Sequence, residues 1–131
     1  MARQLERILY AEDDEDIRDV AIMALEAMGG FTIQSCEHGQ AVVEQVIDFK
    51  PDLLLLDVMM PIMDGPTALQ QVKAMPEMQS LPVIFMTAKV QPQEIAEYKA
   101  LGAIDVITKP FDPMTLADRV RQIWDANGSV S

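Results

Sequence analysis

The stretch Pro51–Pro66, PDLLLLDVMMPIMDGP, constrains the fold of this 131-residue chain more than any other segment. Four consecutive leucines are typical of a strand buried on both faces, as in a parallel sheet covered by helices. The run ends at Asp57, whose carboxylate is costly to bury without a partner. A loop with methionine, proline and glycine follows. A buried strand that ends in a carboxylate predicts a polar site at one edge of a sheet.

Short apolar runs alternate with amphipathic segments along the rest of the chain. Apolar residues spaced three and four apart predict helices, and continuous or alternating apolar runs predict strands. Asp112 and Pro113 suit the cap and first turn of the last helix. The expected strands cover residues 7–11, 31–35, 52–56, 81–87 and 103–110, and the expected helices cover about 17–28, 42–47, 66–72, 95–101 and 113–124.

Five strands that alternate with five helices predict an α/β fold. The helices should cover both faces of a doubly wound, five-stranded parallel sheet, because right-handed crossovers place them there. Half of the residues are apolar, so one domain over residues 1–131, with a core at about 6–126, can bury its own interior. In such sheets the functional crevice lies beyond the carboxyl ends of the strands.

Composition narrows the classes of function. A formal charge of -11 argues against direct binding to nucleic acid. Cys36 is the single cysteine, which excludes an internal disulfide and favours a reducing, cytoplasmic setting. No apolar run approaches the roughly 18 residues of a membrane helix, so we expect no membrane insertion. The single histidine, His38, is expected to cap the second helix or to lie on the surface.

Polar residues end four of the five expected strands. Glu12 and Asp13 end the first, Asp57 the third, Thr87 the fourth and Lys109 the fifth. Three carboxylates at one edge would repel each other unless a cation joins them, and Mg²⁺ is a hard cation that prefers oxygen ligands. An ammonium and a hydroxyl beside them suit a phosphoryl group. The natural nucleophile is Asp57, since carboxylates form aspartyl phosphates.

These motifs resemble the receiver domain of two-component response regulators, the chemotaxis-regulator fold. The resemblance is carried by ILYAEDDEDIR, LLLLDVMMPIMDG, PVIFMTA and GAIDVITKPF, in that order. It implies the flavodoxin-like strand order 2-1-3-4-5. It also implies a switch that accepts a phosphoryl group on Asp57 from a histidine kinase or a histidine phosphotransfer protein. Such a protein catalyses only its own phosphorylation and dephosphorylation.

The resemblance also assigns a metal site. Asp13, Asp57 and the main-chain carbonyl of Met59 would bind Mg²⁺, and Glu12 would act directly or through water. The neighbouring acidic residues have a different expected role, because negative charge in the first turn of a helix is favoured by the helix dipole. We interpret these residues as capping residues: Asp14, Glu15 and Asp16.

The phosphate-binding residues follow from the last two motifs. Thr87 would close on the phosphoryl group with the amide of Ala88, and Lys109 would pair with a phosphate oxygen. The Lys109–Pro110 bond is expected to be cis, a geometry that proline makes accessible. Receivers commonly carry an aromatic switch residue three positions before this lysine, where this chain has Val106. Valine is stiff at its first torsion and cannot swing inward as an aromatic side chain does. The sequence therefore does not identify how a signal would pass from the pocket to the surface.

Three other classes of protein share part of this pattern. A dehalogenase-type hydrolase needs a second acid two residues after its aspartate, where this chain has Met59. A flavodoxin needs a phosphate loop after the first strand, but AEDDED would repel a flavin phosphate. A receiver-like scaffold that works without phosphorylation is the third, and Val106 favours it. The sequence does not identify the downstream target, nor does it decide whether phosphorylated chains form a dimer. No output domain is recognised in these 131 residues.

Overall fold

Five parallel strands form one sheet in the part of the chain that the structure describes. The structure is a computed structural model that describes residues 4–88 and 90–128. The strands are β1 (Arg7–Ala11), β2 (Thr32–Cys36), β3 (Leu53–Asp57), β4 (Val83–Thr87) and β5 (Asp105–Thr108). The α-helices are α1 (Glu15–Met23), α2 (Gly39–Phe49), α3 (Gly65–Lys73), α4 (Pro92–Leu101) and α5 (Leu116–Gly128), with a π-helical turn at Ala24–Met28 and a 3-10 turn at Pro76–Met78.

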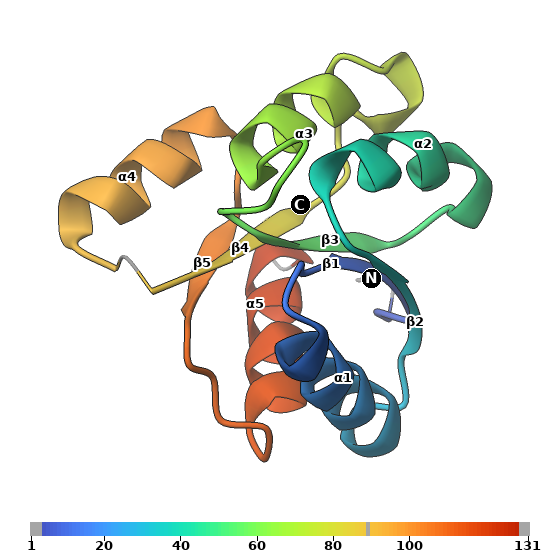
Figure 1. Ribbon diagram of the computed structural model, residues 1–131, viewed down its shortest axis with the longest axis vertical. Coiled ribbons are helices and arrows are strands. Elements are labelled where there is room, and N and C mark those ends of the chain that lie inside the picture. The colour runs from blue at the N-terminus through green and yellow to red at the C-terminus, as the bar shows by residue number, and fades with distance from the viewer. Residues whose placement is uncertain (1–3, 89, 129–131) are drawn as a thin grey trace.

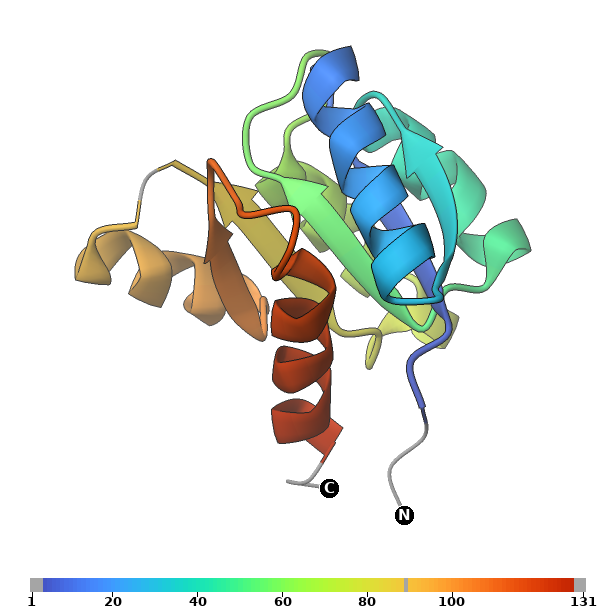
Figure 2. The same cartoon turned by 90° about the horizontal axis from the view of Figure 1, so that it is seen from below.

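The strand order is β2-β1-β3-β4-β5, which confirms the expected topology. Helices α2, α3 and α4 lie on one face of the sheet, and α1 and α5 lie on the other (Figure 1). Figure 2, seen from below, shows α1 and α5 together in front of the strands. Both layers of helices therefore leave the carboxyl ends of the strands at one edge, where the predicted site lies.

The four leucines of β3 divide between two cores. Leu53 and Leu55 pack toward α1 and α5, whereas Leu54 and Leu56 pack toward α2 and α3. Every residue of β3 and of its neighbour β4 is buried, and the edge strands β2 and β5 are partly exposed. This burial confirms that the leucine run is a central strand with apolar neighbours on both faces.

Helix ends agree with most of the expected caps. The Asp14 side chain accepts hydrogen bonds from the amides of Asp16 and Ile17 at the start of α1. His38 caps α2, with its Nδ1 accepting from the Ala41 amide at 3.1 Å. The capping predictions for both segments are therefore confirmed.

All five helices begin one to three residues away from the start that the sequence predicts, and for two of them a cap or turn gives the reason. Helix α3 starts at Gly65, one position before Pro66, because Asp64 caps it by accepting the Thr67 amide at 2.8 Å. Helix α5 starts at Leu116 rather than at the predicted turn after Asp112. The carbonyl of Asp112 does accept the Leu116 amide at 3.0 Å, so the aspartate closes a separate turn that leads into the helix.

Glycine holds the loop between β3 and α3 against the strand end. The Gly65 amide donates to the Val58 carbonyl at 2.9 Å, and the Gly39 amide of α2 donates to the Met63 carbonyl at 2.8 Å. A Cβ at Gly65 would lie only 2.5 Å from the Asp57 carbonyl oxygen. A larger residue at this position would therefore displace the backbone next to Asp57.

Within the described residues, no helix has both the length and the apolar character needed to cross a membrane.

Cys36 gives the fold a measurable dependence on pH. Burial raises the pKa of its thiol from 9.0 to about 11. The unfolded chain therefore ionises this thiol first, and the resulting stability, complete below pH 9, is lost as pH rises to about 11, by about 2–3 kcal/mol. Urea unfolding across this range should show a smaller loss in Cys36→Ala than in the unchanged protein. Equal losses in both proteins would contradict the assignment to Cys36.

Candidate functional site

Residues from three strand ends meet around one lysine. Glu12 follows β1, Asp57 ends β3 and Lys109 follows β5. The Lys109 Nζ atom donates to Glu12 Oε1 at 2.8 Å and to Asp57 Oδ2 at 3.1 Å. The two carboxylates are almost fully buried, with 1% of Glu12 and 6% of Asp57 exposed. One ammonium therefore compensates two buried negative charges.

The surroundings of Lys109 shift the pKa of its ammonium group. Burial by itself lowers the pKa of Lys109, but hydrogen bonds to Glu12 and Asp57, together with their charges, raise it above its ordinary value. A raised pKa means that this lysine stabilises the fold below its unfolded pKa of 10.5 and ceases to do so at higher pH. Lys109 is therefore charged whenever the protein works near neutral pH.

Asp13 completes an acidic cluster with Glu12 and Asp57. One carboxylate oxygen from each of the three lies within 4.8 Å of the other two. Asp13 is exposed, and with Met59 it lines a cleft of about 470 Å³ beside the loop after β3. Carboxylate and carbonyl oxygens are the ligands that Mg²⁺ prefers, so this donor set fits the ion.

Glu12 differs from the other two acids in how its oxygens are used. Its Oε1 accepts from Lys109, and its Oε2 accepts from the Asp14 amide at 3.2 Å. The Arg18 side chain of α1 donates to the Glu12 carbonyl at 2.8 Å and fixes the backbone there. Glu12 is therefore held mainly by protein donors, and Asp13 and Asp57 have more lone pairs left for an ion.

The remaining predicted residues line the same edge. Thr87 ends β4, is 5% exposed, and accepts the Lys109 amide on its carbonyl at 2.9 Å. Ala88 follows it and is exposed. The Lys109–Pro110 peptide bond is cis. This backbone hydrogen bond holds Thr87 beside Lys109, although the two residues lie on different strands.

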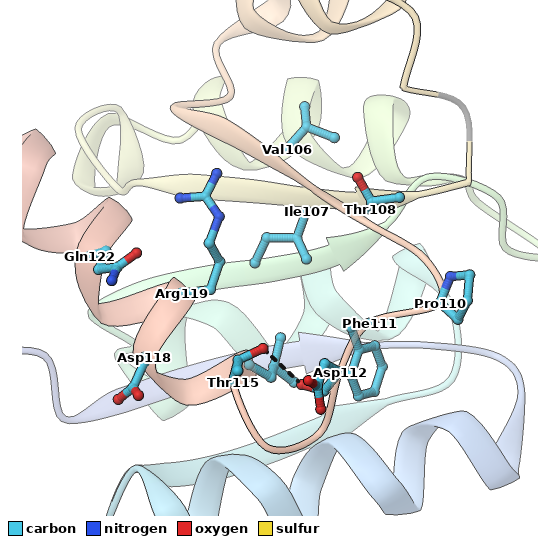
Figure 3. Close-up of a pocket in the computed structure, with 11 residues that line it drawn as sticks. Val106, Ile107, Thr108, Pro110, Phe111, Asp112, Thr115, Asp118, Arg119 and Gln122 are labelled. Carbon is cyan, nitrogen blue, oxygen red and sulfur yellow. Dashed lines mark hydrogen bonds between the residues drawn. The ribbon is translucent and has the colours of Figure 1, made fainter.

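Val106, at the position where receivers commonly have an aromatic residue, is a buried core residue. It pairs with Phe85 across β4 and β5 and belongs to the core under α2 and α3. Figure 3 shows Val106 and Ile107 on opposite sides of β5, beside a cavity of about 430 Å³ between β5 and α5. Of the predicted site residues, Val106 and Pro110 line this cavity.

Sequence reasoning missed one residue that contacts the site and one that packs next to it. Arg18 reads as one charge on the exposed face of a helix, yet it binds the Glu12 backbone. Tyr98 reads as one apolar residue of α4, yet its ring meets that of Phe85, two positions before Thr87, edge to face with centroids 5.4 Å apart. A signal for Tyr98 was available, because the absence of an aromatic at Val106 invites a search for another aromatic nearby.

The geometry and the sequence place the chain in a known class. Residues 8–121 match the family model described as the response regulator receiver domain. The chain belongs to this family, whose members are phosphoaccepting signalling domains of two-component systems rather than enzymes acting on a separate substrate. Receiver domains are generally Mg²⁺-dependent, which agrees with the acidic cluster of Glu12, Asp13 and Asp57.

Curated relatives include transcription regulators. The chain is 33% identical over 131 residues to the transcriptional regulatory protein CseB of Streptomyces avermitilis, covering all of this chain and 54% of that protein. It is 34% identical over 121 residues to the phosphate regulon transcriptional regulatory protein PhoB of Pseudomonas aeruginosa, covering 92% of this chain and 52% of that protein. The chain therefore spans about half the length of these relatives.

Solved structures show the same fold. A putative response regulator from Chloroflexus aurantiacus superimposes with a TM-score of 0.83 at 27% identity, covering 93% of this chain and 99% of that one. The receiver domain of a signal transduction histidine kinase from Syntrophus aciditrophicus gives a TM-score of 0.79 at 30% identity, covering 92% and 91%. The chemotaxis response regulator CheY4 of Vibrio cholerae, at 24% identity and a TM-score of 0.84 over 92% and 99%, supports the fold alone.

Proposed function

We propose that this protein is a phosphorylation switch whose acceptor is Asp57. The observation that carries the proposal is Lys109, which bridges Glu12 and Asp57 at hydrogen-bonding distance while Asp13 lies beside them. A phosphoryl group on Asp57 would bring its negative oxygens to an ammonium and to a site suited to a divalent cation. The donor is a phosphohistidine of a histidine kinase or phosphotransfer protein, as the family implies.

The transfer conserves the phosphoryl group. The bond between phosphorus and the donor's histidine nitrogen breaks as a bond from phosphorus to an Asp57 oxygen forms, and the histidine regains a proton. Lys109 is already placed at the Asp57 carboxylate and would follow the charge onto a phosphoryl oxygen. Thr87 and the amide of Ala88 would bind another oxygen.

The metal would be held by this chain's own oxygens. Asp13, Asp57 and the Met59 carbonyl are the proposed direct ligands, with Glu12 acting directly or through water. Mg²⁺ bound there would supply positive charge as negative charge develops on the transferred oxygens. The hydrogen bond from Lys109 uses Oδ2 of Asp57, so the other carboxylate oxygen remains available to the ion.

A groove beside the acceptor suits the donor protein. It has a volume of about 280 Å³ and lies between α1 and the loop after β5, with Lys109 on its wall. Its lining is mostly apolar and includes Ile17, Val20 and Phe111. Since a donor must bring its phosphohistidine to Asp57, we place its contact surface on this groove.

The proposed function is tested by incubating the protein with acetyl phosphate and Mg²⁺ and recording the intact mass. We expect one added phosphoryl group, and we expect a chelator to prevent it. Beryllofluoride mimics a phosphoryl group on a carboxylate. It should shift the NMR signals of the backbone amides around Asp57. An absent adduct together with an absent beryllofluoride response would contradict the proposal and favour the scaffold that works without phosphorylation.

Two further expectations remain predictions. The first is that residues 1–131 form a single receiver domain, of which the family model covers 8–121. The second concerns the output: the downstream partner, or a dimer of phosphorylated chains, would bind a surface that changes with phosphorylation. The names of CseB and PhoB describe transcription regulation by those proteins, and direct binding of nucleic acid by this chain is not expected at its charge of -11.

A further inference from the structure

The Asp13 carboxylate is placed by its backbone rather than by contacts of its own. Asp13 is exposed, and within residues 4–88 and 90–128 no hydrogen bond or ion pair fixes its side chain. Yet one of its oxygens lies within 4.8 Å of oxygens of Glu12 and Asp57. The contacts of the backbone around Asp13 therefore decide how well this acidic cluster is formed before an ion arrives.

The backbone just before Asp13 is held at both polar atoms of Glu12. The Glu12 amide donates to the Cys36 carbonyl of β2 at 3.1 Å, and the Glu12 carbonyl accepts from Arg18 Nη1 of α1 at 2.8 Å. This carbonyl belongs to the peptide group that joins Glu12 to Asp13, and a peptide group is planar. A hydrogen bond to its oxygen therefore fixes the whole plane, including the Asp13 nitrogen, and limits the rotations left to Asp13.

Arg18 occupies a position that is costly for a charged side chain. Its side chain is only 12% exposed, and a charged group loses favourable hydration when it is buried. The ion pair with Glu37 compensates little, because its atoms are 3.5 Å apart and the Glu37 side chain is 74% exposed. A positive charge beside the acidic cluster would also oppose a bound cation. The short bond from Arg18 to the Glu12 carbonyl is the contact that accounts for its position.

We propose that Arg18 is a positioning residue for the metal site. It fixes the peptide plane between Glu12 and Asp13, so that the Asp13 carboxylate stays near Asp57 in the absence of an ion. Such preorganisation removes the cost of ordering Asp13 when the cation binds. The inference rests on the proposed function, because it requires Asp13 and Asp57 to be ligands of Mg²⁺. It makes α1 part of metal binding, although the helix contributes no ligand.

Arg18→Met removes the guanidinium and keeps most of the apolar stem. If Arg18 acts by position, this variant should bind Mg²⁺ about 10-fold more weakly, at the lower end of the range for groups that orient the ligands of a metal. If its charge mattered instead, removing a cation would tighten binding. The affinity is measured at constant ionic strength from the amide NMR signals around Asp57 during a titration with Mg²⁺. Unchanged or tighter binding would overturn the inference.

Arg121→Met is the matched control, because Arg121 makes the same kind of bond elsewhere. Its Nη2 donates to the Gly29 carbonyl at 2.7 Å, and its guanidinium lies over the Phe31 ring. Gly29 and Phe31 precede β2 and so lie at the opposite edge of the sheet from Asp57. We expect Arg121→Met to bind Mg²⁺ within about 2-fold of the unchanged protein, since a distant charge is screened. An equal loss in both arginine variants would show a general effect and would overturn the inference.

A double-mutant cycle tests whether Arg18 acts through Asp13. Asp13→Ala removes the carboxylate that Arg18 is proposed to position, and it should weaken Mg²⁺ binding by itself. Adding Arg18→Met to Asp13→Ala should then weaken binding further by less than about 2-fold, because the two residues serve one interaction. The same loss from Arg18→Met in both backgrounds would overturn the inference.

The metal-free protein gives a measurement that does not depend on Mg²⁺. In Arg18→Met, the NMR signal of the Glu12 carbonyl carbon should shift upfield because its hydrogen bond is lost. The Asp14 amide, which donates to Glu12 Oε2 at 3.2 Å, should exchange faster with solvent. Unchanged signals and unchanged exchange would overturn the inference. A titration in which the unchanged protein gives no response to Mg²⁺ would instead show that the proposed metal site is wrong, and the inference would fall with it.

Arg18→Lys takes the place of Arg18→Met if the methionine variant does not fold. Lysine keeps the positive charge and the long stem, but its ammonium lacks the rigid planar fork of a guanidinium. We expect weaker Mg²⁺ binding together with the upfield shift of the Glu12 carbonyl carbon. That shift with Mg²⁺ binding as tight as in the unchanged protein would overturn the inference, since the bond would then be lost without consequence.

Discussion

Replacing Asp57 by asparagine should reduce the phosphoryl adduct formed with acetyl phosphate and Mg²⁺ to background. The amide has nearly the shape of the carboxylate but lacks its negative charge and cannot form an acyl phosphate. The fold should persist, because Lys109 would still pair with Glu12 at 2.8 Å. Intact mass measures the adduct, and circular dichroism checks that the variant is folded.

The matched control for this variant is Asp14→Asn. Asp14 lies two residues after Glu12 but serves as the cap of α1, and asparagine caps a helix about as well as aspartate. We expect Asp14→Asn to take up the phosphoryl group as the unchanged protein does. An adduct of normal size in Asp57→Asn would show that another residue is the acceptor.

Lys109→Met should be the most destabilising single substitution in the site. It leaves Glu12 and Asp57 buried, with 1% and 6% exposed, and without the ammonium that binds both. Removing one partner of a buried ion pair costs about 3–5 kcal/mol, because the remaining charge is uncompensated. Urea unfolding at neutral pH with chelator should show this loss.

Magnesium distinguishes the electrostatic cause from a packing defect. A cation bound by Asp13 and Asp57 supplies the missing positive charge, so the stability of Lys109→Met should rise with Mg²⁺ concentration more than that of the unchanged protein. Lys99→Met is the control, since the exposed pair with Asp105 is worth about 0–1 kcal/mol. Lys109→Met within about 1 kcal/mol of the unchanged protein, without Mg²⁺, would contradict this account of the site.

The parallel sheet and the acidic cluster could be predicted because strand ends fix positions in space. Once β1, β3 and β5 run in the same direction, Glu12, Asp57 and Lys109 must end at one edge, however far apart they lie in the sequence. The four leucines identify the central strand without ambiguity. Chemistry at that edge then follows from residue type, since carboxylates need a cation and an ammonium suits phosphate.

Contacts made by helices were harder to predict. The edge-to-face contact between Tyr98 and Phe85 depends on how α4 is laid over β4, and the weak apolar pattern of α4 does not determine that placement. The start of α5 at Leu116 likewise reflects a local competition in which Asp112 closes a turn. Such details are set by tertiary packing, which overrides local propensity at helix ends.

The position of Lys109 in the chain also bears on the order of folding. Its bonds to Glu12 and Asp57 join residues 97 and 52 positions apart, so the carboxylates have no lysine partner until β5 has docked beside β4. Closing such long loops is slow compared with forming local helices. During synthesis from the amino terminus, these acids would stay hydrated until the last strand arrives. The ability to accept a phosphoryl group should therefore report completion of the whole sheet.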